Sequence, residues 1–169
     1  LATFMGGMGL GAVLLPRLLS PRHHPLRVYA LLEIGIAVCG GLLLLLMPLL
    51  ARHYPAAAEP GLSAFALRGL VAGLCLLPPT VLMGATLPVV ARWVGGSRTG
   101  MARLGLFYGG NIAGAAAGTL LAGFYLLRYH DVVVASFVAM AVNEGVACLT
   151  IALTAREAPD PGVSSGVDQ

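Results

Sequence analysis

The sequence predicts an all-α fold, a polytopic transmembrane bundle of about five helical spans. The first reason is composition, since 58% of the residues are hydrophobic, only 10% are charged and the mean hydropathy is +0.89. A soluble domain averages about 25% charged residues, more than twice this share. The second reason is that the apolar residues form long runs, and each crossing needs roughly 20 of them. The third is that the arginines lie near the ends of these runs.

The first two spans are expected over residues 1–15 and 28–50. The first begins in apolar sequence without an initiator Met and ends at Pro16, so we expect it to belong to a longer protein that continues upstream. Between the two spans, residues 20–25 hold two prolines and charged side chains. Prolines break helices and charges are unfavourable in lipid, so this stretch should be a loop.

Three further spans are expected over 62–94, 104–127 and 132–155, which completes a transmembrane domain over 1–155. The third is longer than one crossing needs and contains Pro78, Pro79 and Pro88. We therefore expect one tilted or kinked helix that uses these prolines and Gly84 as a hinge or a packing site. Residues 156–169 are acidic and rich in Pro, Gly and Ser, which is typical of a tail or linker.

The arginines predict the orientation of the bundle. Loops one and three carry six of the ten: Arg17, Arg22, Arg27, Arg92, Arg98 and Arg103. Loops two and four carry Arg52 and Arg128, with Arg68 inside the third span. Cytoplasmic loops near spans are enriched in basic residues, so loops one and three and the tail are expected in the cytoplasm. Because this charge reflects topology, the lipid bilayer is the expected partner and nucleic acid is not.

Most of the larger aromatic residues lie near the predicted span ends, as interfacial aromatics do. They are Tyr29, Tyr54, Trp93, Tyr108, Tyr125 and Tyr129.

Glycine spacing is the strongest local pattern. Gly7 to Ala12 fits G-x-G-x-x-G/A, but a dinucleotide loop needs a preceding strand, and these glycines lie inside an apolar run. The spacing Gly7-xxx-Gly11 instead favours close packing between helices. The fourth span repeats it at Gly105-xxx-Gly109 and at Gly110, Gly114 and Gly118. Such faces can pack within one chain or in a homo-oligomer, and the alternative is a smooth surface for a moving transporter helix.

Polar residues inside the spans are candidate functional residues, because an ionisable group at that depth is costly. The alternative is a structural hydrogen bond or ion pair between helices. Glu33 lies about two turns from the predicted cytoplasmic end, where Arg92 or Arg103 could pair with it. Arg68 should extend outward to the membrane surface. The candidates are Glu33, Arg68, Asn111 and Glu144.

No catalytic, metal-binding or cofactor-binding set is expected in this chain. Cys39, Cys75 and Cys148 lie inside apolar runs without metal-ligand spacing and are expected to act as small hydrophobic residues. No Ser/His/Asp set can be placed with assurance, and the sequence has no P-loop.

Four stretches resemble the membrane region of bacterial spermidine synthase-like proteins, also described as fused major-facilitator/spermidine synthases. The most specific is residues 78–88, PPTVLMGATLP, within 77–92. The others are 7–17, GMGLGAVLLPR; 29–35, YALLEIG; and 103–124, RLGLFYGGNIAGAAAGTLLAGF. The resemblance covers roughly residues 1–155.

This resemblance implies a multi-span region in a bacterial inner membrane that anchors or regulates a cytoplasmic aminopropyltransferase-like domain. In the family that domain has a Rossmann-type methyltransferase fold and uses decarboxylated S-adenosylmethionine and putrescine. It is absent from this chain, so any polyamine transferase activity would belong to the full-length protein. The alternative is part of a transporter or exporter for polyamines or other small cations, with Glu33 and Glu144 as cation-binding groups.

Overall fold

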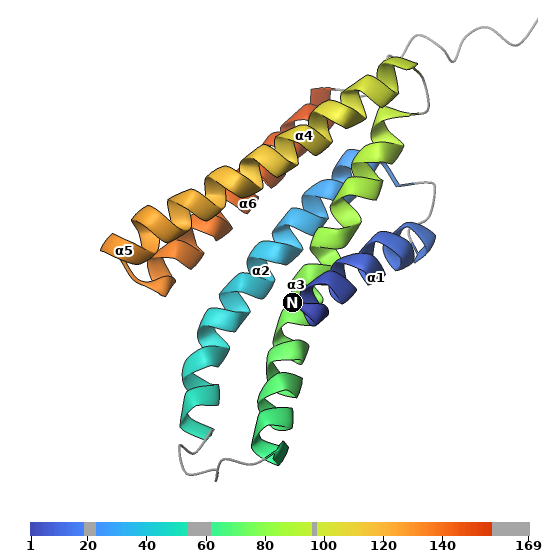
Figure 1. The fold of residues 1–169 in the computed structure, drawn as a ribbon. Helices are drawn as coiled ribbons and strands as arrows, with labels where there is room; N and C mark the ends of the chain where they lie inside the picture. The colour runs from blue at the N-terminus through green and yellow to red at the C-terminus, as the bar shows by residue number, and fades with distance from the viewer. Residues whose placement is uncertain (19–22, 54–61, 96–97, 157–169) are drawn as a thin grey trace, which may run out of the picture.

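The computed structural model describes residues 1–18, 23–53, 62–95 and 98–156 of the chain. The predicted tail after Arg156 lies outside the described residues, as do residues 19–22, 54–61 and 96–97 of the first three loops. In Figure 1 the chain forms helices that run up and down, with one helix lying across them. The described elements are α1 (Ala2–Leu18), α2 (Pro25–His53), α3 (Leu62–Val94), α4 (Arg98–Leu120), the π-helical turn η1 (Leu121–Leu126), α5 (Leu127–Tyr129) and α6 (Val132–Arg156).

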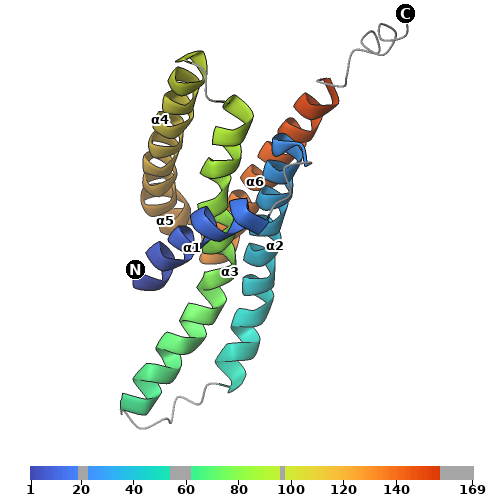
Figure 2. The ribbon, with the colours of Figure 1, turned by 90° about the vertical axis from the view of Figure 1, so that its right-hand side faces the viewer.

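The prediction of an all-α membrane bundle is confirmed. Four segments of the described chain are long and apolar enough to cross a membrane: Pro25–Leu50, Ala66–Val94, Thr99–Tyr129 and Val132–Arg156. The first helix, with 17 residues, is shorter than these. Figures 1 and 2 show it crossing the middle of α3 at an angle instead of running beside it. The number of full-length spans in the described chain is therefore four, where about five were expected.

The helix ends gather into two groups. Figures 1 and 2 place the start of α2, the end of α3, the start of α4 and the end of α6 together. These helix ends carry Arg27, Arg92, Arg103 and Arg156. We call this the arginine-rich end, and the described arginines of the opposite end are Arg52, Arg68 and Arg128.

The contact between α1 and α3 is made through glycines. Gly7 and Gly11 are the buried residues of α1. A Cβ atom added to Gly11 would collide with the backbone carbonyl of Val81, and one added to Gly84 would collide with that of Met8. The two backbones therefore touch directly, which a side chain at either glycine would prevent.

The third helix passes through its prolines without a break. α3 is one helix over Leu62–Val94, and Figures 1 and 2 show that its two halves point in different directions. Pro78 and Pro79 have no N–H, so the carbonyls four residues earlier lose their helical donors. Next to them the hydroxyl of Thr80 donates to the carbonyl of Leu76 at 2.9 Å, a contact that often bends helices.

The helix α2 lies between α3 and α6. Its contact with α3 is a cluster of buried apolar side chains: Val28, Leu32, Ala85 and Val89. Its contact with α6 includes Gly40 and Gly41, which face the side chain of Met140. Two buried threonines of α6, Thr150 and Thr154, donate their hydroxyls to carbonyls of their own helix, so their polar groups are satisfied inside the bundle.

The helix packing expected for the fourth span is not found in the described chain. Nothing lies within 4 Å of a Cβ atom added to Gly105, Gly109, Gly110, Gly114 or Gly118. The described contacts of this part of the chain lie at other residues. In α4, Phe107 packs edge-on against Trp93, with ring centroids 6.0 Å apart, and beyond its end Leu126 of η1 is buried.

Candidate functional site

The buried carboxyl of Glu33 marks the candidate site. Its side chain is only 8% exposed, in a helix segment whose mean hydropathy is 2.4. The other buried polar side chains of the described residues are threonines, which donate to backbone carbonyls. A carboxylate cannot satisfy itself in this way, because it needs donors. Glu33 is therefore the position where the described bundle accommodates an ionisable group.

The antiparallel register places Glu33 in the contact between α2 and α6. Figure 1 shows these two helices running side by side in opposite directions, and Met140 lies against Gly40. Glu33 is seven residues before Gly40, and Ala147 is seven residues after Met140, so the two residues lie at the same level. Ala147 is 1% exposed, so α6 covers α2 at this level.

Tyr29 is the polar neighbour of Glu33. The two residues are four apart in α2 and therefore lie on one face of the helix. The phenol of Tyr29 lies near the carboxyl of Glu33 and interacts with it electrostatically. The ring also packs against the apolar cluster of α2 and α3, which fixes its position. The tyrosine thus connects the buried carboxyl to the space on the other side of its ring.

That space is a small pocket of about 70 Å³ between α2, α3 and α4. Its polar lining comes from Tyr29, Thr86 and Asn111, and its apolar lining from Leu87, Val90 and Phe107. The hydroxyl of Thr86 donates to the carbonyl of Met83 at 2.7 Å, and the amide of Asn111 has no hydrogen-bond partner among the described residues. A water molecule needs roughly 10–15 Å³ of such volume, so the pocket has room for a few waters or a small cation.

The arrangement is a short polar path within a membrane domain. It leads from Asn111 and Thr86 through the phenol of Tyr29 to the carboxyl of Glu33. Tyr29 lies four residues from the start of α2, so the pocket is about one helical turn from the arginine-rich end. Groups of this kind can bind a small cation or exchange a proton.

The remaining sequence candidates are placed elsewhere. No ion pair joins Glu33 to Arg92 or Arg103 within the described chain, and the polar neighbour of the carboxyl is the phenol of Tyr29. Arg68 is exposed near the start of α3, at the opposite end of the bundle from the pocket. Glu144 is exposed on α6. The structure brings Asn111 toward Glu33 through Tyr29 and leaves the two other candidates outside this group.

Sequence reasoning missed the roles of Tyr29 and Thr86. Tyr29 was expected to be an interfacial aromatic, but it is half-buried and lies beside Glu33. The spacing of four residues in YALLEIG was the available signal, because an acceptor and a donor four apart share a helix face. Thr86 had no comparable signal, since its place depends on how α3 and α4 meet.

Within residues 1–18, 23–53, 62–95 and 98–156, no group of three or more His, Cys, Asp or Glu side chains could hold a metal ion. No family model, no curated protein and no solved structure matches the chain.

Proposed function

We propose that this chain is the membrane region of a spermidine synthase-like protein, and that it anchors or regulates a cytoplasmic aminopropyltransferase-like domain. In this proposal the arginine-rich end faces the cytoplasm of a bacterium. The observation that carries it is the motif PPTVLMGATLP at residues 78–88, with the three accompanying stretches in the same order.

The positions of the motifs in the bundle support treating them as one unit. Gly11, from the first stretch, contacts Val81 in the PPT motif. A Cβ atom added to Gly35, from YALLEIG, would lie 3.0 Å from the side chain of Leu82. The fourth stretch contributes Phe107 to the same region. The residues of the resemblance therefore meet at one junction of α1, α2, α3 and α4, as a scaffold would require.

Aminopropyl transfer in membranes tests the proposal. We expect membranes from cells that produce the full-length protein to convert putrescine to spermidine with decarboxylated S-adenosylmethionine. A variant that lacks residues 1–155 should move this activity to the soluble fraction, because the apolar helices hold the enzyme at the bilayer. Membranes from cells without the gene are the control. Absence of transfer in every fraction would refute the proposal.

The orientation can be tested by labelling single cysteines. In a variant without Cys39, Cys75 and Cys148, a membrane-impermeant maleimide should label Ser97→Cys only after the cells are opened. The matched variant His130→Cys lies at the other end of the bundle and should be labelled in intact cells. Labelling of Ser97→Cys in intact cells would show that the orientation is the opposite of the one proposed.

A second candidate function is transport of a small cation, and the buried carboxyl of Glu33 favours it. The carboxyl is paired with a phenol next to a pocket large enough for a small cation. An intramembrane carboxylate of this kind is often part of an ion or proton pathway. Flux of a polyamine or a monovalent cation into liposomes separates this candidate from the first.

A further inference from the structure

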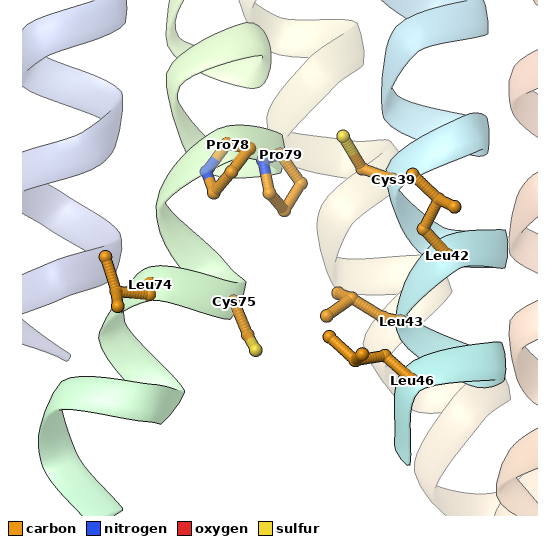
Figure 3. A pocket seen from close by; sticks show the side chains of 8 residues that line it. All are labelled: Cys39, Leu42, Leu43, Leu46, Leu74, Cys75, Pro78 and Pro79. Carbon is orange, nitrogen blue, oxygen red and sulfur yellow. The ribbon is translucent and has the colours of Figure 1, made fainter. Parts of the chain in front are cut away.

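A larger cavity, of about 320 Å³, lies between α2 and α3 on the side of the bundle away from the arginine-rich end. Figure 3 shows Cys75 and Pro79 of α3 on the side toward α2, while Leu74 lies on the other side of α3. One wall is formed by Cys39 and three leucines of α2, and the other by Leu74, Cys75, Pro78 and Pro79 of α3. None of these side chains is charged, and the thiols are the most polar groups among them. We call this cavity the proline slot.

The slot exists because the two helices separate below their main contact. They are close at Gly35 and Leu82 and along the apolar cluster nearer the arginine-rich end. Figures 1 and 2 show α2 and α3 diverging from there toward their other ends. The divergence begins at Pro78 and Pro79, whose effect on the helix is a bend. An opening lined with apolar side chains therefore lies between α2 and α3.

The apolar lining of the slot and its location in the membrane-spanning part of the bundle favour a hydrocarbon chain as the occupant. An engineered apolar cavity of about 150 Å³ stays dry and binds benzene or xenon, and the slot is roughly twice as large. Leu42 and Leu74, at 59% and 62% exposure, belong to its walls, so the slot opens sideways out of the bundle. Both walls belong to segments long and apolar enough to span a membrane, where the medium outside is lipid.

The shape of the slot matches a chain aligned with the helices. On α2 the lining runs from Cys39 to Leu46, seven residues, or about 10 Å along the helix axis. Acyl chains in a bilayer also lie along this direction. A rounded ligand of the same volume would not need lining residues spread over about two turns of α2 and more than one turn of α3.

A cationic side chain stands where the head group of such a lipid would lie. Arg68 precedes Cys75 by seven residues and Pro79 by eleven, so the three share one face of α3. Its Cα is about 10 Å from that of Cys75, toward the membrane surface. Arginine is suited to phosphate because its planar guanidinium can donate two parallel hydrogen bonds.

We propose that the proline slot binds one acyl chain of a bilayer phospholipid, whose phosphate is held by Arg68. This inference goes beyond the proposed function, although Pro78 and Pro79 of the slot also belong to the motif at residues 78–88. It assigns a role to these prolines and to the position of Arg68.

Native mass spectrometry of the purified full chain tests it. The wild-type protein is expected to keep one phospholipid per chain through purification in mild detergent. Leu43→Trp should lower this retention about tenfold or more, because an indole in the slot displaces several buried methylenes. The matched control is Leu45→Trp, which places the same indole at a position that is 72% exposed and outside the slot. Cys75→Phe fills the slot from the other wall and should reproduce the loss.

The head-group contact is tested in the same measurement. Arg68→Gln is expected to lower phospholipid retention, while Arg68→Lys keeps part of it. Arg128→Gln removes another exposed arginine at the same end and should have no effect. Equal phospholipid retention in Leu43→Trp, Leu45→Trp and the wild type would overturn the proposal. A wild-type complex that holds only detergent, or a second protein chain in place of lipid, would overturn it as well.

Discussion

Replacing Gly84 by valine is expected to destabilise the bundle by roughly 1–3 kcal/mol or more, the range measured when tightly packed sites are overfilled. A Cβ atom at this position would collide with backbone atoms of Met8, which cannot move aside like the end of a flexible side chain. The helices α1 and α3 would have to separate. The melting temperature of the purified full chain in detergent measures the effect.

The matched control for this variant is Gly114→Val. It makes the same change in an apolar helix, but nothing lies within 4 Å of the added Cβ atom. Its effect should stay within about 0.5 kcal/mol, as for substitutions without new contacts. A second variant on the other helix, Gly11→Val, should resemble Gly84→Val, since its Cβ would collide with the backbone of Val81. Equal melting temperatures for Gly84→Val and Gly114→Val would contradict the contact between α1 and α3.

Replacing Glu33 by glutamine is expected to abolish cation flux in liposomes that contain the full-length protein, if the chain transports cations. The amide keeps the size of the side chain and can accept a hydrogen bond through its oxygen, as the carboxyl can. It removes the negative charge, which is the group that would bind a cation or carry a proton. Folding should therefore be retained while flux is lost. Initial rates of polyamine and monovalent cation uptake, with melting temperatures of the same samples, measure both.

Two further variants define this experiment. Glu144→Gln removes a carboxyl that is exposed on α6, and its flux should stay close to wild type. Tyr29→Phe keeps the carboxyl but removes the polar group beside it, so an intermediate rate is expected. Unchanged flux in Glu33→Gln would exclude Glu33 from transport. No flux in the wild type would exclude transport itself and leave the anchoring proposal.

The helices could be predicted from the sequence, because each depends on a local property. Apolar runs of sufficient length and the prolines and charges between them place α2, α3 and α6 close to their observed bounds. α3 is the clearest example, since it extends over the predicted 62–94 despite three internal prolines. A helix with so many apolar neighbours is held by its surroundings as well as by its own hydrogen bonds.

The contacts between helices were harder to predict, because one pattern can have two outcomes. The spacing of Gly7 and Gly11 brings α1 against α3, whereas the same spacing at Gly110 and Gly114 faces no neighbour in the described chain. Small residues permit a close approach but do not provide the partner. The partner helix depends on the directions that the bends of α3 and the ends of α4 give to each helix. No local sequence pattern predicts these directions.

The candidate site was predictable only in part for the same reason. The carboxyl of Glu33 stands out in an apolar run, and its rarity alone marks it. Its partner was expected among arginines at the same membrane surface, but its polar neighbour is a tyrosine one turn away in its own helix. The pocket with Asn111 and Thr86 requires three helices to be in place, so it follows from the packing and not from the order of residues.

The π-helical turn at Leu121–Leu126 has a consequence for comparing this chain with its relatives. Such a turn closes hydrogen bonds over five residues instead of four, so it contains one residue more than a regular turn. Side chains beyond it are rotated by about 100° from the positions that a regular helix would give them. A related chain with one residue fewer here can therefore keep the same faces on both sides of the turn. A single-residue gap in this segment marks the loss of the π-helical turn and not the loss of a helix.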